Sequence, residues 1–420
     1  MKLNHWILAG FTAAVGMSPA FADVPAKPTF TKDVLPILQE NCQECHREKP
    51  VKMSGLVAPF SLVSYEQARP WAKAIGKAVS TRYMPPWDAT QDFHGVFRNE
   101  RSLTQDEINT VVRWVDQGAK RGNPKDAPAP LKFANKKWWI GEPDLIVPLP
   151  EKIWVGDEVE DWQPLINVKL TEEQLPEDRW IRVIEAQADS AAVHHIVVYG
   201  TNPHQKVRTE AAGRLGYGNL GGLAPGAEPS ELQDGYGILL KKGSTLRISM
   251  HYHKEPGAGT GSWDQSRLGF FFYEPDAEVT PVNIEPIGDL RFSIPPGADN
   301  YLVKMDHTFD QPFEILNMLP HMHLRGKSAR YTAFYPDGKS EVLLDVPTYD
   351  YNWQTSYEYP EPKQFPAGTR IQVEMRFDNS ANNPSNPDPN KEIHFGGKTT
   401  DEMALGWMSY SWTDDKATTD

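Results

Sequence analysis

The two cysteines of this 420-residue chain, Cys42 and Cys45, lie three positions apart, and His46 follows directly. Because the chain has no other thiol, disulfides cannot stabilise the rest of it, and its fold depends on the burial of apolar side chains. The stretch CQECH has the C-x-x-C-H pattern in which two cysteines attach a haem covalently and the histidine binds its iron. A redox-active C-x-x-C pair is the alternative, but it requires a βαβ setting that the flanking sequence lacks. We therefore expect one covalent haem c at these three residues.

A methionine is the expected second axial ligand of this haem iron. Met84 is the first choice, because it lies in the stretch RYMPPW, where two prolines favour an extended loop. A thioether ligand raises the reduction potential, which suits an electron relay. Met53 and His94 are the other candidates for this position.

The residues around the haem motif predict three helices. Thr31 is a candidate N-cap for a helix that leads into the motif, and a second helix is predicted from Tyr65 to Val79. A capping box, Thr104-Gln105-Asp106-Glu107, begins the third helix. We therefore predict a small all-α cytochrome c domain over residues 23–135.

Residues 1–22 have the features of a secretory signal peptide, with Lys2, a short apolar run from Ile7 to Met17, and the cleavage signal Ala20-Phe21-Ala22. The apolar run is too short to cross a membrane, and no later segment has about 18 consecutive apolar residues. We expect an exported protein, periplasmic or secreted, with no membrane span. The net charge of −13 also argues against a nucleic-acid partner, which requires basic patches.

The pattern changes after about residue 135, beyond a proline-rich linker at 126–130. Short runs rich in β-branched and aromatic residues follow, such as Trp180–Ala186, Thr245–His253 and Arg370–Phe377. Helical periodicity is nearly absent, and the length suits two β-sandwiches better than one. The predicted architecture is therefore an all-α domain followed by two all-β domains.

Histidines are concentrated in this β-rich half. The chain has 12 histidines, and six of them form three tight groups, His194-His195, His251-x-His253 and His321-x-His323. On a strand, side chains two positions apart share a face, whereas neighbours point to opposite faces. The last group is therefore predicted to present two imidazoles side by side, with Met322 pointing into the core. For the adjacent pair in VHHIVVYG two arrangements are possible. Either one histidine faces the core and the other faces water, or the chain bends there and both bind one metal.

Clustered imidazoles suit zinc, copper, iron and nickel. A zinc hydrolase is expected to add a carboxylate or cysteine ligand and a general base, and the sequence has no H-E-x-x-H motif. A methionine ligand would select copper, because a soft thioether favours Cu(I). The pattern alone leaves four candidates for that ligand, Met318, Met375, Met403 and Met408.

Together these motifs resemble the copper type II, ascorbate-dependent monooxygenases, a family that includes the peptidylglycine α-hydroxylating and dopamine β-monooxygenases. HH, HY, H-x-H and a late DEM occur in that order, and the resemblance covers nearly all of the chain after residue 22. It is strongest in PHMHLRGK, YNWQTSY, FDNSANNPSNPDP and TTDEMALGW. The chain most resembles a bacterial branch of the family with a cytochrome c domain in front.

The resemblance implies two copper ions, one on each of two jelly-roll-like β-sandwich domains at 136–283 and 284–415, which face each other across a solvent-filled gap. The residues that match the electron-storing copper site are His194, His195 and His251. The residues that match the site of oxygen binding and C–H cleavage are His321, His323 and Met403. Both adjacent histidines are thus expected to reach one metal, whereas His253 is not a usual ligand of the family.

The same resemblance limits the substrate. Leu319 occupies the position of an arginine that helps to hold the substrate carboxylate in the peptide enzyme, and Leu405 and Trp407 replace an asparagine and a tyrosine after the methionine. A peptide C-terminus is therefore not the expected substrate, and the pocket is expected to be more apolar.

The predicted function is an exported haem–copper monooxygenase that hydroxylates a C–H bond of a small organic substrate with O2. Electrons from an external donor, a small reductant or a redox protein, are expected to enter through the haem. The same ligands would also serve a non-catalytic haem and copper electron carrier or a copper-binding protein, which is the alternative prediction. Oxygen uptake coupled to a substrate distinguishes the two.

Overall fold

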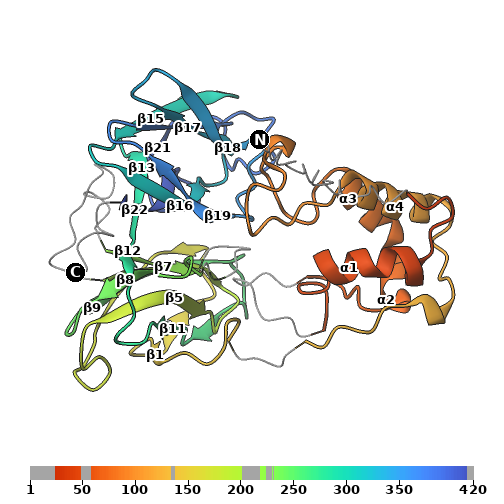
Figure 1. The fold of residues 1–420 in the computed structure, drawn as a ribbon, viewed down its shortest axis with the longest axis horizontal. Helices are drawn as coiled ribbons and strands as arrows, with labels where there is room; N and C mark the ends of the chain where they lie inside the picture. Colours follow the sequence, from red (N-terminus) through yellow and green to blue (C-terminus); the bar gives the residue numbers. More distant parts are fainter. Residues whose placement is uncertain are drawn as a thin grey trace, which may run out of the picture.

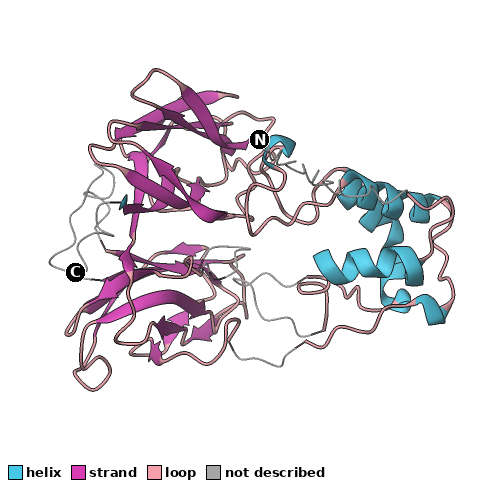
Figure 2. Cartoon of the chain, in the orientation of Figure 1, coloured by secondary structure: helices cyan, strands magenta, loops and turns pink. Residues whose placement is uncertain are grey.

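The computed structural model describes residues 24–48, 58–133, 138–200, 218–223, 229 and 231–413. A small N-terminal helical part is followed by a large, mainly antiparallel β part made of several sheets (Figures 1 and 2). The prediction that a helical part precedes a β part is confirmed. None of the described helices has the length and apolar character needed to span a membrane. The predicted signal peptide and Met53 lie outside the described residues.

The helical part packs short helices around one apolar core that contains Phe30, Leu38 and Trp114. Its helices are η1 (Phe30–Val34), α1 (Leu35–Asn41), α2 (Tyr65–Ala68), η2 (Arg69–Trp71), α3 (Ala72–Ser80), α4 (Gln105–Asp116) and η4 (Pro124–Asp126). The short helix η3 (Gln91–Phe93), between α3 and α4 in the sequence, packs against the second β region instead. The predicted capping box at the start of α4 is present. The Thr104 hydroxyl accepts a hydrogen bond from the Glu107 N–H, and the Glu107 carboxylate accepts one from the Thr104 N–H.

The start of the first helix differs from the prediction. Residues Phe30–Val34 form a π-helical turn, and α1 begins at Leu35 without a side-chain cap. Thr31 is buried in this turn and donates its hydroxyl to the Arg121 carbonyl at 3.1 Å. The predicted N-cap was therefore wrong, because a backbone acceptor far away in the sequence takes the hydroxyl. The predicted second helix is present as α2, η2 and α3 in succession.

The first β region is built around two larger sheets that share one buried core. Its strands are β1 (Leu145–Pro148), β2 (Ile153–Val155), β3 (Asp161–Trp162), β4 (Leu165–Lys169), β5 (Arg179–Gln187), β6 (Val193–Gly200), β7 (Asn219–Leu223), β8 (Tyr236–Leu240), β9 (Thr245–His253), β10 (Ser262–Asp264), β11 (Arg267–Phe272) and β12 (Thr280–Pro281). One sheet has the order β1-β11-β5-β8-β12, and the other has the order β3-β9-β6-β7 with β4 also paired to β9. Ile184 and Phe270 from the first sheet and Val198 and Ile248 from the second belong to the same hydrophobic cluster.

The second β region has the same layered construction. Its strands are β13 (Asn283–Asp289), β14 (Ser293–Ile294), β15 (Tyr301–Thr308), β16 (Phe313–His321), β17 (Gly326–Phe334), β18 (Ser340–Val346), β19 (Tyr357–Phe365), β20 (Arg370–Phe377), β21 (Ile393–His394) and β22 (Ala404–Trp412). The two larger sheets have the orders β13-β22-β16-β19 and β15-β20-β17-β18. In β20, buried residues alternate strictly with half-buried ones, which is the period of a strand with one face on a core.

A segment between α3 and α4, residues 87–100, crosses from the helical part to the second β region, and we call it the strap (Figure 1). Trp87 and Phe97 are buried in the hydrophobic core of the second β region. Backbone hydrogen bonds join the strap to β18 and β19, from Thr90 N–H to the Asp345 carbonyl at 2.9 Å and from Arg98 N–H to the Glu358 carbonyl at 2.8 Å. The strap thus ties the helical part to the second β region, although it lies within residues 23–135.

Candidate metal centre

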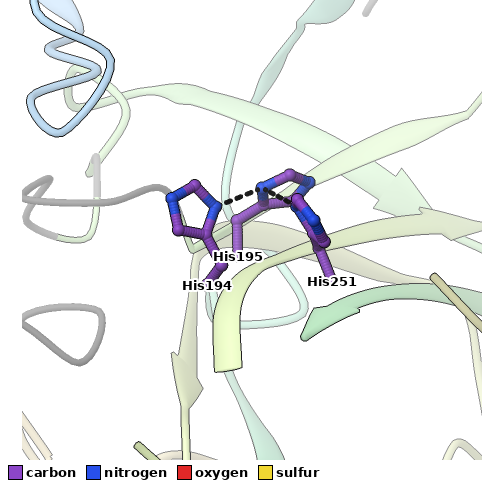
Figure 3. A group of neighbouring side chains, drawn as sticks. All are labelled: His194, His195 and His251. Atoms are coloured by element: carbon purple, nitrogen blue, oxygen red, sulfur yellow. Dashed lines mark hydrogen bonds between the residues drawn. The ribbon is translucent and has the colours of Figure 1, made fainter. Parts of the chain in front are cut away.

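The first histidine set comes from β6 and β9, which are neighbours in one sheet. His195 is paired with His251, and the register shifts between Val193 and His195. Such a β-bulge changes the direction of side chains in the bulged strand. His194 and His195 therefore turn toward the same place although they are adjacent on a strand, as Figure 3 shows. The chain bends at this pair.

The three imidazoles converge closely enough to hold one metal ion. The Nδ1 atom of His195 is 3.2 Å from the Nδ1 of His194 and 3.2 Å from the Nδ1 of His251 (Figure 3). One potential ligand atom from each residue lies within 4.8 Å of the others. A neutral imidazole carries only one N–H, so His195 Nδ1 cannot donate to both neighbours. A metal ion would satisfy all three lone pairs at once.

Burial keeps His194 and His195 in the neutral form that binds metals. Burial, with the nearby charges of His251 and His253, lowers the pKa of His194 to about 3. The pKa of His195 also lies well below its usual value, again because of burial and then the neighbouring histidines. Neutral imidazole, with an available lone pair, is the form that ligates a metal.

A carboxylate orients the third histidine of this set. The Nε2 of His251 lies 3.2 Å from Asp161 Oδ1, so Nε2–H donates and the Nδ1 lone pair faces the other two rings. Thr399 donates its backbone N–H to Asp161 Oδ2 at 2.9 Å, and its hydroxyl donates to the same oxygen. Burial by itself would raise the pKa of Asp161, but the hydrogen bonds from His251 and Thr399 hold it well below the usual range. Asp161 is therefore an anionic acceptor for His251.

The second histidine set lies at the end of β16. His321 is the last residue of that strand, and the rings of His321 and His323 are 5.4 Å apart at 88°. Met322 between them is fully buried in the core of the second β region, as predicted. The two imidazoles are thus neighbours on the side of the chain away from that core.

Hydrogen bonds fix which nitrogen of each ring is available for a metal. His321 Nδ1 lies 2.6 Å from Gln354 Oε1, and His323 Nδ1 lies 3.2 Å from the Asp401 carbonyl. Both partners are acceptors, so each Nδ1 carries the proton and each Nε2 keeps a lone pair. The Nε2 of His323 is buried and has no hydrogen-bond partner. A buried nitrogen of this kind is what a metal ligand requires.

Met403 is held next to this pair by a buried carboxyl group. Glu402 accepts backbone hydrogen bonds from His323 at 2.8 Å and from Arg325 at 2.6 Å. Burial raises the pKa of Glu402 to about 8, although these backbone donors act in the opposite direction. Met403 follows in the chain and borders the same cavity as His321 and His323. The residues present therefore fit a metal bound by two imidazoles and a thioether.

The other methionine candidates have different surroundings. Met318 and Met375 are fully buried in the hydrophobic core of the second β region. Met408 belongs to that core as well, although it also borders the cavity. Of the four methionines, Met403 is the one in a loop against the second histidine set.

The two histidine sets lie in contact with each other. The rings of His195 and His321 are 6.2 Å apart, and the Tyr351 ring stacks on His194 at 4.8 Å and lies 6.1 Å from His323. A cavity lies beside this contact, bordered by His195 from one set and by His321 and His323 from the other. Tyr351, in the loop between β18 and β19, lies against both sets. His253 is outside the converging group, 3.9 Å from Asp161.

The haem motif follows α1 in the helical part. Both thiols are half-buried, and burial, followed by the charge of Cys45, raises the pKa of Cys42 to about 12. His46 Nδ1 lies 3.1 Å from the Phe60 carbonyl, so Nδ1–H donates and Nε2 keeps its lone pair. Burial lowers the pKa of His46, which again favours neutral imidazole. The histidine thus has the tautomer that an axial iron ligand needs.

The candidates for the second axial ligand of the haem iron lie in different parts of the chain. Met84 is half-buried and comes four residues after the end of α3. His94 is an exposed strap residue whose Nδ1 is 2.8 Å from Glu100 Oε1. Met53 is outside the described residues.

Several residues that shape the site were not identified from the sequence: Asp161, Tyr351, Gln354, Thr399 and Glu402. Four of them lie in or beside the motifs YNWQTSY and TTDEMALGW, which carried the resemblance. Asp161 had no such signal, because its position beside His251 depends on the pairing of β3 with β9. Its role becomes visible only in the sheet.

Comparisons with known proteins add little to this geometry. No family model matches the chain, and no curated protein matches it. Among solved structures, a turret protein of Sulfolobus turreted icosahedral virus is 13% identical, with a TM-score of 0.14, over 62% of this chain and 98% of that chain. The VP2 subviral particle of infectious bursal disease virus is 10% identical, with a TM-score of 0.17, over 69% of this chain and 84% of that chain. Scores this low carry no argument about fold or function.

Proposed function

We propose that the chain is an exported haem–copper monooxygenase that hydroxylates a C–H bond of a small organic substrate. The observation that carries the proposal is the contact between the two histidine sets beside a cavity that both of them border. The resemblance to the copper type II, ascorbate-dependent monooxygenases agrees with this arrangement. The net reaction is R–H + O2 + two electrons + two protons, which gives R–OH and water.

Each group has its proposed ligands. One copper is held by His194, His195 and His251. The other copper is held by His321, His323 and Met403. The haem is held by Cys42, Cys45, His46 and Met84. Bound in this way, copper and iron supply one-electron redox chemistry, and a soft thioether favours copper over zinc at the second site.

The protein's own residues prepare these sites. Asp161 fixes His251 with its Nδ1 toward the metal position, and Gln354 fixes His321 with its Nε2 free. His323 is fully shielded, at 1% exposure, and Asp401 holds its ring in one orientation. Ligands fixed in this way need little rearrangement when the metal changes its charge.

The strap supports electron delivery from the haem. It begins three residues after Met84, and the Trp87 ring lies 5.0 Å from that of Tyr357 at the start of β19. The β18–β19 loop directly before Tyr357 carries Tyr351, whose ring stacks on His194. The strap therefore packs against the strand that follows the loop whose Tyr351 contacts both histidine sets. The cavity beside His321 favours an enzyme over a pure electron carrier, which needs no space for a substrate.

The test is metal analysis with haem quantitation on full-length protein matured in a periplasm, followed by oxygen uptake. We expect two copper ions and one haem per chain, and oxygen uptake that depends on an added organic substrate and a reductant. Full occupancy by zinc would contradict the proposal. Copper and haem at full occupancy with no substrate-dependent oxygen uptake would favour the electron carrier.

A further inference from the structure

A cavity of about 260 Å³ lies between the two β regions, and its walls come from both. His195 borders it from the first region, and His321, His323 and Met403 border it from the second. If the proposed function is right, this cavity holds the substrate, because the oxygen-binding copper is assigned to the latter three residues. The chemistry of its walls then limits the substrate.

The wall beside His321 is a two-stranded ladder of β16 and β22. Its register forms three pairs whose six members all border the cavity: His321 with Leu405, Leu319 with Trp407, and Asn317 with Ser409. Two apolar side chains, Leu319 and Leu405, thus lie next to the histidine. The neutral polar pair is four residues further along the strand, about 13 Å away at the usual rise per residue.

The wall from the first β region shows the same order of side chains. His195, Val197 and Tyr199 alternate on β6 and all border the cavity, so an imidazole is followed by an aliphatic group and then a phenol. Leu223 borders the cavity from the neighbouring strand β7. Both walls are therefore apolar beside the histidines and polar but uncharged beyond them.

Fixed charge is nearly absent from these walls. Among the described residues that border the cavity, none has a carboxylate, and Arg182 is the single lysine or arginine. Arg182 forms an ion pair with Glu231, so its charge is already balanced. An unpaired charge is costly to bury in such surroundings. Among the described lining residues an ammonium group would find no counter-ion, and a carboxylate would have to compete with Glu231.

We propose that the substrate is an uncharged, mainly hydrocarbon molecule. Its apolar end contacts Leu319, Leu405 and Trp407 beside the second histidine set, where the C–H bond is hydroxylated. Its neutral hydrogen-bonding group, such as an alcohol, reaches Asn317 and Ser409 at the other end of the ladder.

The test compares three ligands with the same carbon skeleton, 4-phenylbutanol, 4-phenylbutylamine and 4-phenylbutyrate. They are neutral, cationic and anionic at neutral pH. Binding is measured by titration calorimetry to the full-length protein, loaded with haem and copper and kept oxidised so that no turnover occurs. We expect the alcohol to bind about 100-fold more tightly than either ion, because each ion loses its hydration without a partner. Equal or tighter binding of either ion, or no binding of the alcohol at millimolar concentration, would overturn the proposal.

A charge placed on the wall provides the matched control. Leu319 is half-buried, so Leu319→Arg is expected to fold, and it should shift the preference toward 4-phenylbutyrate. Leu319→Gln, a neutral change, should keep the preference for the alcohol. The comparison of the three ligands on the wild-type protein needs no variant, so it still tests the proposed substrate class if Leu319→Arg does not fold.

The outcome is separable from that of the proposed function. Selective binding of the alcohol without any hydroxylation under reducing conditions would refute the monooxygenase and leave the neutral pocket in place. Preferential hydroxylation of a charged ligand would support the monooxygenase and refute the proposal of an uncharged substrate.

Discussion

The imidazole rings of His195 and His321 meet edge to face, with centroids 6.2 Å apart at 89°, although they belong to different β regions. Burial lowers the pKa of both rings, which favours their neutral form. Two metal ions bound to these sets would therefore exchange electrons over a short distance through side chains already in contact.

Loss of one ligand should separate the two copper sites. His194→Ala removes one of three converging nitrogens, so we expect one copper to be lost while His321 and His323 stay loaded. His253→Ala is the control, because its ring lies outside the converging group. Copper content per chain, measured by mass spectrometry after dialysis, should fall from two to one in the first variant and stay at two in the second. Copper loss in the control would make His253 a ligand.

The thioether should matter more for turnover than for occupancy. Met403→Leu leaves two imidazoles with free lone pairs, so most copper should remain at the second site while hydroxylation is lost. Met375→Leu makes the same change in the core, where Met375 is fully buried, and should cost less than about 1.5 kcal/mol of stability with activity kept. Copper content and substrate-dependent oxygen uptake are measured together. Full activity of Met403→Leu would reject its assignment.

The haem ligands can be tested by their spectra. Cys42→Ala should weaken or abolish covalent haem retention under denaturing conditions, because a thioether bond is lost. Met84→Ala should remove the thioether-to-iron absorption at the red edge of the visible spectrum and keep the covalent haem. Survival of that band would transfer the assignment to Met53, and Met53→Ala is the matching variant.

The strap should make stability depend on pH. Burial, followed by repulsion from Asp350, raises the pKa of Asp88 to about 7 from 3.8 in an unperturbed chain. The folded protein therefore binds the proton more tightly than the unfolded chain, and its stability falls as pH rises from about 4 to 7. Ionisation of Asp88 would cost the folded state up to about 4 kcal/mol. Asp88→Asn should remove this loss.

The measurement for Asp88 is the difference in melting temperature between pH 5 and pH 8. The melting temperature of the wild type should fall more between pH 5 and pH 8 than that of Asp88→Asn, since the two proteins share all other titrating groups. Asp92→Asn changes an exposed carboxylate of the same strap and should behave as the wild type. An identical pH difference in all three proteins would contradict the prediction.

The strap should also stabilise the second β region. Trp87 is 7% exposed in the core of that region, so Trp87→Ala should lower the free energy of unfolding by about 3–5 kcal/mol. Trp263→Ala removes a tryptophan that is 59% exposed, and its effect should stay within about 0.5 kcal/mol. Denaturant unfolding followed by circular dichroism measures both. A chain that begins at residue 136 lacks Trp87 and Phe97. Its free energy of unfolding is expected to fall by at least as much as that of Trp87→Ala.

Local signals were enough to predict much of the secondary structure. The capping box at Thr104–Glu107 and the strict alternation in Arg370–Phe377 depend on neighbours within a few positions, and both are present in the structure. The N-cap assigned to Thr31 failed because its partner, Arg121, is far away in the sequence. Local patterns therefore predicted elements better than they predicted the partners of single side chains.

The sequence by itself determined which ligand types are present and in which order. His321 and His323 are two positions apart, so any extended chain brings their imidazoles close together, and the burial of Met322 between them follows from the same geometry. CQECH likewise contains all three residues of the proposed haem attachment, because the motif spans one turn of chain.

Only the tertiary structure decided how these groups are used. The β-bulge before His195 turns two adjacent histidines to one place, and sheet pairing brings Asp161 to His251. The contact between His195 and His321 depends on the packing of two separate cores against each other. These relationships depend on contacts between distant segments, and such contacts follow from the burial of whole sheets rather than from the spacing of any motif.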